Sequence, residues 1–269
     1  MTKHVEMKRI IIALITSTII LGCTSQVKDS EHNINQENIT LATIWYQSSP
    51  EMKALYYQGF NIAKERVVEY SKQKSSKPKA VVVDLDETMI DNSPFQGKMI
   101  ETGKPFTPEM WGEWVALEQA EALPGAVEFS QFCQSVGVDV IYLSNRTVDE
   151  QDATMRNMEK IGFAFVKPEN FFLKDTTSGK EPRRQLVSQK FDIILLLGDN
   201  LNDFAEVFED RTDSWGQPIV DEYREEFGRR FIAFPNPMYG EWEKNIYNHE
   251  RISDEDTRFK LRRKAVKAF

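Results

Sequence analysis

The stretch that decides the fold is Ala80-Val81-Val82-Val83-Asp84-Leu85-Asp86-Glu87-Thr88. Its first four residues are apolar and mostly β-branched, which is typical of a strand that is buried on both faces. Two carboxylates, Asp84 and Asp86, follow where that strand ends. A carboxylate can attack phosphorus as a nucleophile, and a second one can carry the proton to and from the leaving oxygen. The motif therefore predicts phosphoryl chemistry at a strand end.

Strand-like runs and helical segments alternate along the rest of the chain. Apolar runs occur at 80–83, 138–143, 163–166, 192–197 and 231–234. Helical segments separate them, and one opens with Thr147 and Glu150 at the spacing of a capping box. This order predicts an α/β fold, a doubly wound parallel sheet with right-handed crossovers. Ligands of such sheets bind beyond the carboxyl ends of the strands, so the segments after residues 83, 143 and 197 should border one crevice.

Two segments depart from that alternation. Apolar residues recur at helical spacing between Pro50 and Val67, which predicts an N-terminal helix before the first strand. Residues 94–122 carry several aromatic side chains among charged ones, which indicates a small helical cap inserted over the crevice. We expect residues 41–269 to form one domain with this cap, because about 230 residues suit one α/β domain with an insertion.

The N-terminal residues have the pattern of a bacterial export signal. Lys8-Arg9 precedes an apolar stretch from Ile10 to Leu21, and Ile20-Leu21-Gly22-Cys23 resembles a lipobox. We expect residues 1–22 to be a lipoprotein signal peptide, Cys23 to be lipidated and residues 23–40 to be a flexible polar tether. The protein would then be anchored to a membrane of the bacterial cell envelope, the outer membrane in a Gram-negative cell.

The charge of the remaining chain argues against nucleic-acid binding. Without residues 1–22 the chain has 31 basic and 41 acidic residues, a net charge of −10. A nucleic-acid polymer requires a basic face, and the basic run Lys260–Lys264 is more typical of a solvated helix end. If Cys23 is acylated, Cys133 has no partner for an intramolecular disulfide, and we expect it to be buried.

Three further segments supply groups that suit a phosphate and a metal ion. Ser144 and Asn145 offer a hydroxyl and an amide at the end of the second apolar run, and Lys180 can keep the nucleophile ionised. Asp199 and Asp203 follow five consecutive aliphatic residues. Mg²⁺ prefers a few carboxylate oxygens together with water and phosphate, so Asp199 suits direct ligation, with Asp203 behind it orienting Asp199 or Lys180. Each segment alone is equally typical of a turn or a surface; their combination indicates a site.

The paired acidic signatures resemble those of the haloacid dehalogenase (HAD) superfamily. Within it they are most similar to the class C acid phosphatases, bacterial lipoproteins with nonspecific acid phosphatase or 5′-nucleotidase activity. Residues 82–92 resemble the first signature of that class, and residues 194–204 resemble the second. The likeness runs from about Leu41 to near the end of the chain. One departure is Phe95, where the class usually has tyrosine.

This resemblance implies a role for each candidate residue. Asp84 would be the nucleophile and Asp86 the acid/base, and Mg²⁺ would be held by the Asp84 carboxylate, the Asp86 carbonyl and Asp199. The remaining implied contacts are phosphate binding by Ser144, Asn145 and Lys180, and stacking on the ring of the substrate by Trp111 and Tyr239. The resemblance also implies a homodimer and small phosphomonoester substrates such as nucleoside 5′-monophosphates.

Two other functions fit the same sequence. A phosphotransferase would pass the phosphoryl group to an alcohol through the same aspartyl-phosphate, and the sequence does not separate it from a hydrolase. A lipid-anchored solute-binding protein could use the same fold, because function depends on the site and not on the scaffold. A carrier has no need of a nucleophile, so Asp84 favours the enzyme. For Trp111 and Tyr239, packing within the cap and a loop is as plausible as stacking on substrate.

Overall fold

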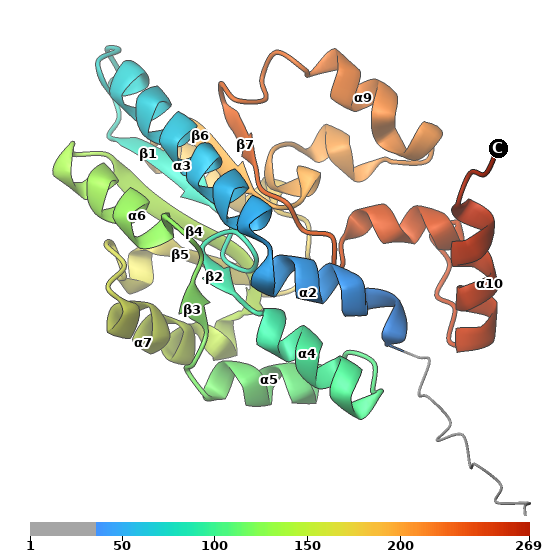
Figure 1. Ribbon diagram of the computed structural model, residues 1–269. Coiled ribbons are helices and arrows are strands. Elements are labelled where there is room, and N and C mark those ends of the chain that lie inside the picture. Colours follow the sequence, from blue (N-terminus) through green and yellow to red (C-terminus); the bar gives the residue numbers. More distant parts are fainter. Residues whose placement is uncertain (1–35) are drawn as a thin grey trace, which may run out of the picture. The chain divides into compact units, whose positions relative to one another are not determined.

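The computed structural model describes residues 36–269 (Figure 1). Cys23, the predicted signal peptide and most of the predicted tether lie outside these residues. Of the predicted tether, Glu37–Ile39 form a 3₁₀ turn and Thr40 begins the first α-helix. The elements that follow are α2 (Thr40–Ser48), α3 (Pro50–Ser71), β1 (Lys79–Val83), β2 (Ile90–Asp91), α4 (Ser93–Thr102), α5 (Pro108–Ala116), β3 (Glu121–Ala122), α6 (Ala126–Ser135), β4 (Asp139–Thr147), α7 (Gln151–Ile161), β5 (Phe171–Lys174), α8 (Glu181–Lys190), β6 (Asp192–Gly198), α9 (Gln217–Glu222), β7 (Phe231–Ala233) and α10 (Glu255–Ala265).

Five parallel strands form the main sheet, in the order β5-β4-β1-β6-β7. The strand of the opening motif, β1, is central, with Val82 opposite Ile141 of β4 and Leu196 of β6. Both neighbouring strands run in the same direction as β1, so Asp84 and Asp199, which follow β1 and β6, and Ser144, which lies in the last part of β4, belong to one edge of the sheet. The predicted α/β fold with a parallel sheet is confirmed.

The two faces of the sheet are covered by different helices, as the alternation of β1 requires. Val81 and Val83 belong to a hydrophobic cluster with residues of α3 and α6, which lie across one face in Figure 1. Ala80 and Val82 belong to a second cluster with Val187 of α8 and with phenylalanines that follow β6. Because apolar side chains cover both faces of β1, its carboxyl end is held in a fixed position. Among residues 36–269, no helix has the length and apolar character needed to cross a membrane.

The N-terminal helices hold the turn that follows β1. Ser49 caps α3 by accepting hydrogen bonds from the backbone N–H groups of Glu51 and Met52, and Pro50 occupies the first turn. Further along the chain, the Tyr56 hydroxyl donates to the backbone carbonyl of Glu87, and the Tyr46 hydroxyl lies 2.5 Å from that of Tyr56. Both tyrosines are fully buried. They attach the motif turn to α2 and α3.

The cap consists of α4 and α5, which lie between β2 and β3 and account for most of the predicted cap segment 94–122. These short strands pair antiparallel, with Ile90 opposite Ala122 and Asp91 opposite Glu121. Next to them, Asn157 of α7 accepts a hydrogen bond from the N–H of Ala120 and donates one to its carbonyl, at 3.0 and 2.9 Å. Both ends of the cap are therefore fixed where they leave the domain.

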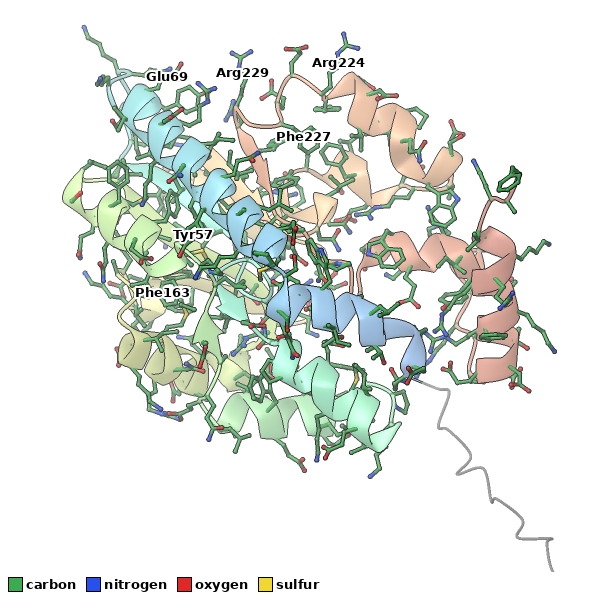
Figure 2. All side chains as sticks on the ribbon, viewed as in Figure 1. Tyr57, Glu69, Phe163, Arg224, Phe227 and Arg229 are labelled. Atoms are coloured by element: carbon green, nitrogen blue, oxygen red, sulfur yellow. The ribbon has the colours of Figure 1, made fainter. Side chains whose placement is uncertain are left out.

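One predicted strand is wrong. Residues 163–166 form an irregular connection, and β5 is Phe171–Lys174, which pairs with Tyr142 and Leu143 of β4. Phe165 has a left-handed backbone (φ 58°), which a strand does not allow. The ring of Phe163 packs against Tyr142, and Figure 2 shows Phe163 between α6 and α7. Burial of a loop thus produced the apolar run that resembled a strand.

Candidate active site

Asp84, Lys180 and Asp203 form a buried ionic triad at the carboxyl end of the sheet. Lys180 lies at the N-terminus of α8, and its Nζ is 2.5 Å from Asp84 Oδ1 and 2.5 Å from Asp203 Oδ1. All three side chains are buried. Burial raises the pKa of Asp84 well above its usual range, and the Lys180 ammonium acts in the opposite direction. The two carboxylates raise the pKa of Lys180 despite its burial, so this cation stays charged. The structure brings these three sequence-predicted residues together.

Asp199 completes a group of three carboxylates. One oxygen each of Asp84, Asp199 and Asp203 lie within 4.8 Å of one another. Burial is the main cause that raises the pKa of Asp199 to about 7, and the neighbouring Asp203 adds to it, whereas a hydrogen bond from Asn236 lowers it. Three carboxylates thus share one ammonium at short range, and this excess negative charge favours binding of a cation.

The free oxygens of this group point to Asp84 and Asp199 as the ligands of a divalent metal. Both oxygens of Asp203 are engaged, Oδ1 by Lys180 and Oδ2 by the N–H of Asn200 at 2.9 Å. Asp84 Oδ2 and Asp199 Oδ1 accept no hydrogen bond from residues 36–269. The donor set is carboxylate oxygen, which suits a hard cation such as Mg²⁺. The residues present fit such an ion, with Asp203 in the supporting position predicted for it.

Asp86 belongs to a separate network. Its Oδ1 accepts hydrogen bonds from Arg146 Nε at 2.9 Å and Asn92 Nδ2 at 2.8 Å, and its Oδ2 accepts one from the Ser144 hydroxyl at 3.2 Å. The two motif carboxylates are therefore held by different cations, Asp84 by Lys180 and Asp86 by Arg146. Ser144 lies beside the motif as predicted, although its hydroxyl contacts Asp86 in this structure.

Comparison with known proteins identifies the family of this chain. The sequence model of the HAD superfamily, subfamily IIIB (acid phosphatase), matches residues 7–242. The chain belongs to this HAD family. A solved class C acid phosphatase from Bacillus anthracis is 40% identical, with a TM-score of 0.83 over 87% of this chain and 99% of the other. The same Bacillus protein, solved with tungstate bound, aligns equally well over 88% of this chain. The resemblance predicted from the signatures is confirmed.

Plant relatives of this HAD family are more distant. The chain is 27% identical to a stem 28 kDa glycoprotein of Glycine max over 63% of this chain and 63% of that protein. It is 29% identical to a stem 31 kDa glycoprotein of Glycine max over 50% of this chain and 49% of the other, so it spans less than two thirds of both relatives. Vegetative storage protein 1 of Arabidopsis thaliana is 24% identical over 82% of this chain and 72% of its own length.

Trp111 and Tyr239, the residues predicted to stack on substrate, contact other side chains of the protein in this structure. Trp111 of α5 meets Phe95 edge to face, with ring centroids 5.2 Å apart, and the Arg146 guanidinium lies 5.3 Å from its ring centroid. The Tyr239 hydroxyl donates to the Glu87 carboxylate, which is fully buried. Phe95, the departure from the class signature, keeps the packing of a ring. Both predicted stacking residues are half-buried, and their contact with substrate stays a prediction.

Two arginines at the site were not assigned from the sequence. Arg146 directly follows Ser144 and Asn145 at a strand end, and this position was the available signal. Arg183 lies one turn after Lys180 and donates to the Ser144 carbonyl at 2.5 Å and to the Asn145 side chain at 2.6 Å. Asn145 is exposed, and through Arg183 it is joined to the start of α8. The side chain of Asn145 is thus held at the edge of the site.

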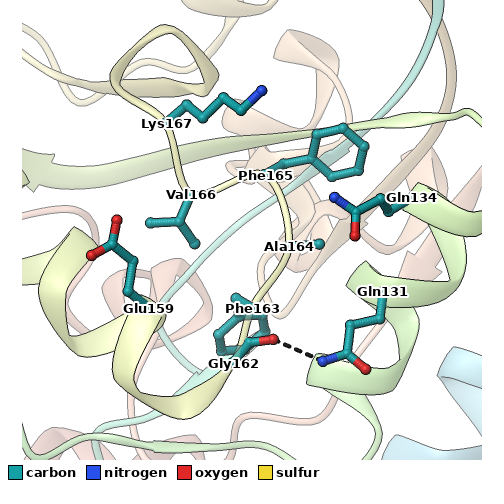
Figure 3. A pocket seen from close by; sticks show the side chains of 9 residues that line it. All are labelled: Gln131, Gln134, Glu159, Gly162, Phe163, Ala164, Phe165, Val166 and Lys167. Carbon is teal, nitrogen blue, oxygen red and sulfur yellow. Dashed lines mark hydrogen bonds between the residues drawn. The ribbon is translucent and has the colours of Figure 1, made fainter.

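A surface hollow elsewhere in the chain contains none of these residues. It has a volume of about 590 Å³ and is lined by the ends of α6 and α7 and by residues 162–167 (Figure 3). These segments precede β4 and β5, so the hollow lies at the amino ends of the strands, opposite the edge that carries Asp84. Its side chains offer no grouping suited to phosphoryl chemistry.

Proposed function

We propose that this protein is a magnesium-dependent phosphomonoesterase of the bacterial cell envelope. It hydrolyses nucleoside 5′-monophosphates and other organic phosphomonoesters through an aspartyl-phosphate on Asp84, and it is anchored by lipid on Cys23 and acts as a homodimer. The observation that carries this proposal is the contact of Lys180 with Asp84 Oδ1, which leaves Oδ2 without a hydrogen bond from residues 36–269, in a carboxylate group that also contains Asp199. Membership of an acid phosphatase family supports it.

The chemistry follows from what each side chain can do. Asp84 Oδ2 forms a bond to phosphorus while the bond from phosphorus to the leaving oxygen breaks, and Asp86 gives its proton to that oxygen. Water then attacks the phosphorus of the aspartyl-phosphate, Asp86 takes its proton, and the bond to Asp84 breaks. Lys180 favours the ionised form of Asp84 before attack, against the effect of burial, and stays charged beside the phosphoryl group. A divalent cation on Asp84 and Asp199 would neutralise charge on the phosphoryl oxygens.

A bound oxyanion in a relative supports a phosphate-binding role for this chain. Tungstate is a tetrahedral oxyanion, as phosphate is, and it is bound in the 40% identical Bacillus anthracis class C acid phosphatase. In the present chain the N-terminus of α8, Lys180 and the Ser144 hydroxyl are the donors at the carboxyl edge of the sheet. A phosphoryl group beside Asp84 would replace the contacts that Ser144 and Lys180 make with carboxylates here.

The test is the release of phosphate from a panel of substrates. The panel contains nucleoside 5′-monophosphates, sugar phosphates and an aryl phosphate, each measured before and after treatment with EDTA and after addition of Mg²⁺. We expect loss of turnover on chelation and recovery with Mg²⁺. Full activity after exhaustive chelation would contradict ligation by Asp84 and Asp199. Adding an alcohol and measuring its phosphorylation separates hydrolysis from transfer.

A further inference from the structure

Arg146 connects the acid/base carboxylate to the cap. Its side chain is buried, with 3% of the residue exposed, at the end of β4. Nε donates to Asp86 Oδ1 at 2.9 Å, Nη2 donates to Asn92 Oδ1 at 3.1 Å, and the guanidinium carbon lies 5.3 Å from the centroid of the Trp111 ring. One planar group therefore touches the motif that follows β1, the base of the cap and a cap helix.

The partners of Arg146 are themselves joined. Asn92, the residue that precedes α4, donates to Asp86 through Nδ2 at 2.8 Å and accepts from Trp114 Nε1 at 2.8 Å through Oδ1. Asn92 is fully buried. The direction in which Asp86 points is thus set by β4 on one side and by the cap on the other. Asp84 has no contact of this kind with the cap, because its partner is Lys180 of α8.

We propose that Arg146 is a positioning residue that couples the contact of the leaving group with Trp111 to the orientation of Asp86. This inference rests on the proposed phosphomonoesterase activity. A guanidinium has donors in a fixed plane, so it cannot follow Trp111 without changing its hydrogen bond to Asp86. A leaving group with a ring that packs against Trp111 fixes the Trp111 side chain and, through it, the guanidinium plane of Arg146. A leaving group too small to reach Trp111 gives no such support.

Because of this coupling, we expect contact with the cap to raise kcat for substrates whose leaving group reaches Trp111. Binding energy from a remote part of a substrate raises kcat when it is used to place a catalytic group in the transition state. A ribonucleoside 5′-monophosphate and glycerol phosphate both expel an alkoxide, and they differ in the presence of a ring system. We therefore expect wild-type protein to turn over the nucleotide faster at saturation, and the ratio of the two kcat values measures the coupling.

The experiment compares Arg146→Met and Arg146→Lys with wild type on these two substrates and on p-nitrophenyl phosphate. Help from a general acid is worth roughly 10²–10⁴-fold. We expect Arg146→Met to lose roughly 10–10²-fold in kcat on the nucleotide, a part of that help, and less on glycerol phosphate. The kcat ratio then moves toward one, and p-nitrophenyl phosphate, whose leaving group needs little help, is affected least. Arg146→Lys keeps a cation near Asp86 but not the planar fork, so it also loses the ratio.

Two further variants separate positioning from structural support. Thr154→Val removes the hydrogen bond of Arg146 Nη1 to α7, 3.0 Å long, and leaves its contacts with Asp86, Asn92 and Trp111. It should lower stability and keep the kcat ratio. Trp111→Leu should lower the ratio without disturbing the buried ion pair, and it should add nothing to Arg146→Met, because coupled residues are not additive. If Arg146→Met does not fold, Trp111→Leu still tests the coupling.

The outcomes are distinct. Equal losses on all three substrates for Arg146→Met, or a Trp111→Leu variant that changes KM alone, would overturn the role of Arg146. If wild-type protein releases phosphate from none of the three substrates, the proposed function itself fails. Loss of the ratio in Arg146→Met and Trp111→Leu, together with its retention in Thr154→Val, would establish the coupling.

Discussion

At the scale of single residues, the two motif carboxylates differ in their partners, and this difference is testable. Asp84→Asn removes the proposed nucleophile and a proposed metal ligand, so activity should fall to background on every substrate. Asp86→Asn keeps the backbone and loses the proton carrier, so its defect should follow the leaving group. General acid help is worth roughly 10²–10⁴-fold and is needed most when an alkoxide departs. A nucleotide should therefore lose more than an aryl phosphate.

Burst kinetics on the aryl phosphate complete that comparison. In Asp86→Asn the aspartyl-phosphate should form and persist, because the group proposed to activate water is absent. A burst of the released phenol should therefore precede slow turnover. Equal losses on both substrates without a burst would mean that Asp86 acts through the fold. Asp84, Lys180, Asp199 and Asp203 were predictable because each follows a strand end or begins a helix. The role of Arg146 was not predictable, because it depends on the direction of the Asp86 side chain, which the sequence does not give.

Cys133 gives a second prediction for a single residue. It is fully buried in α6, and burial raises the pKa of its thiol to about 12. Because the thiolate is the reactive form, native Cys23→Ser protein, in which Cys133 is the remaining thiol, should resist iodoacetamide at pH 8. The same protein in denaturant should react fully, as mass spectrometry would show. Rapid alkylation of the native protein would contradict the burial of α6 against the sheet.

At the scale of elements, two helical glycines should respond oppositely to alanine. A Cβ at Gly59 of α3 would lie 2.5 Å from the ring of Phe234, which is held between Tyr56 and Phe60, whereas a Cβ at Gly112 of α5 meets nothing within 4 Å. Gly59→Ala should therefore destabilise by about 1–3 kcal/mol through overpacking. Gly112→Ala should stabilise by about 0.5–1 kcal/mol. Urea unfolding measures both, and a stable Gly59→Ala variant would contradict the close packing of α3 on the sheet.

The elements also show where the sequence pattern sufficed. The capping box of Thr147 and Glu150 is present, and β1, β4, β6 and β7 lie at or within a few residues of the predicted runs. Those segments carry their own signal in β-branched residues and caps. The apolar run at 163–166 carried the same signal for another reason, since it packs under two helices as a loop. Periodicity reports burial, and a short buried loop cannot be told from a short buried strand.

At the scale of the whole molecule, anchoring and catalysis should be separable. Cys23 lies outside the described residues, and the proposed site is built from residues 84–239. Cys23→Ser should therefore leave an uncleaved or soluble form of the protein, with unchanged phosphate release per folded molecule. Cell fractionation with an activity assay on purified protein measures both effects. A loss of specific activity in the folded variant would show that the anchor and the site are not independent.

The short pairing of β2 with β3 has a consequence for how this protein can diversify. Because the chain leaves and re-enters the domain through adjacent paired residues, the segment between them forms one continuous insertion. Helices of another length or composition can be grafted there while the five-stranded sheet keeps its register. Asp84 and Lys180 lie outside this insertion, whereas Trp111 and Asn92 lie within it. Substrate preference can thus change through the cap helices while the proposed nucleophile is untouched, provided that Asn92 keeps its contact with Asp86.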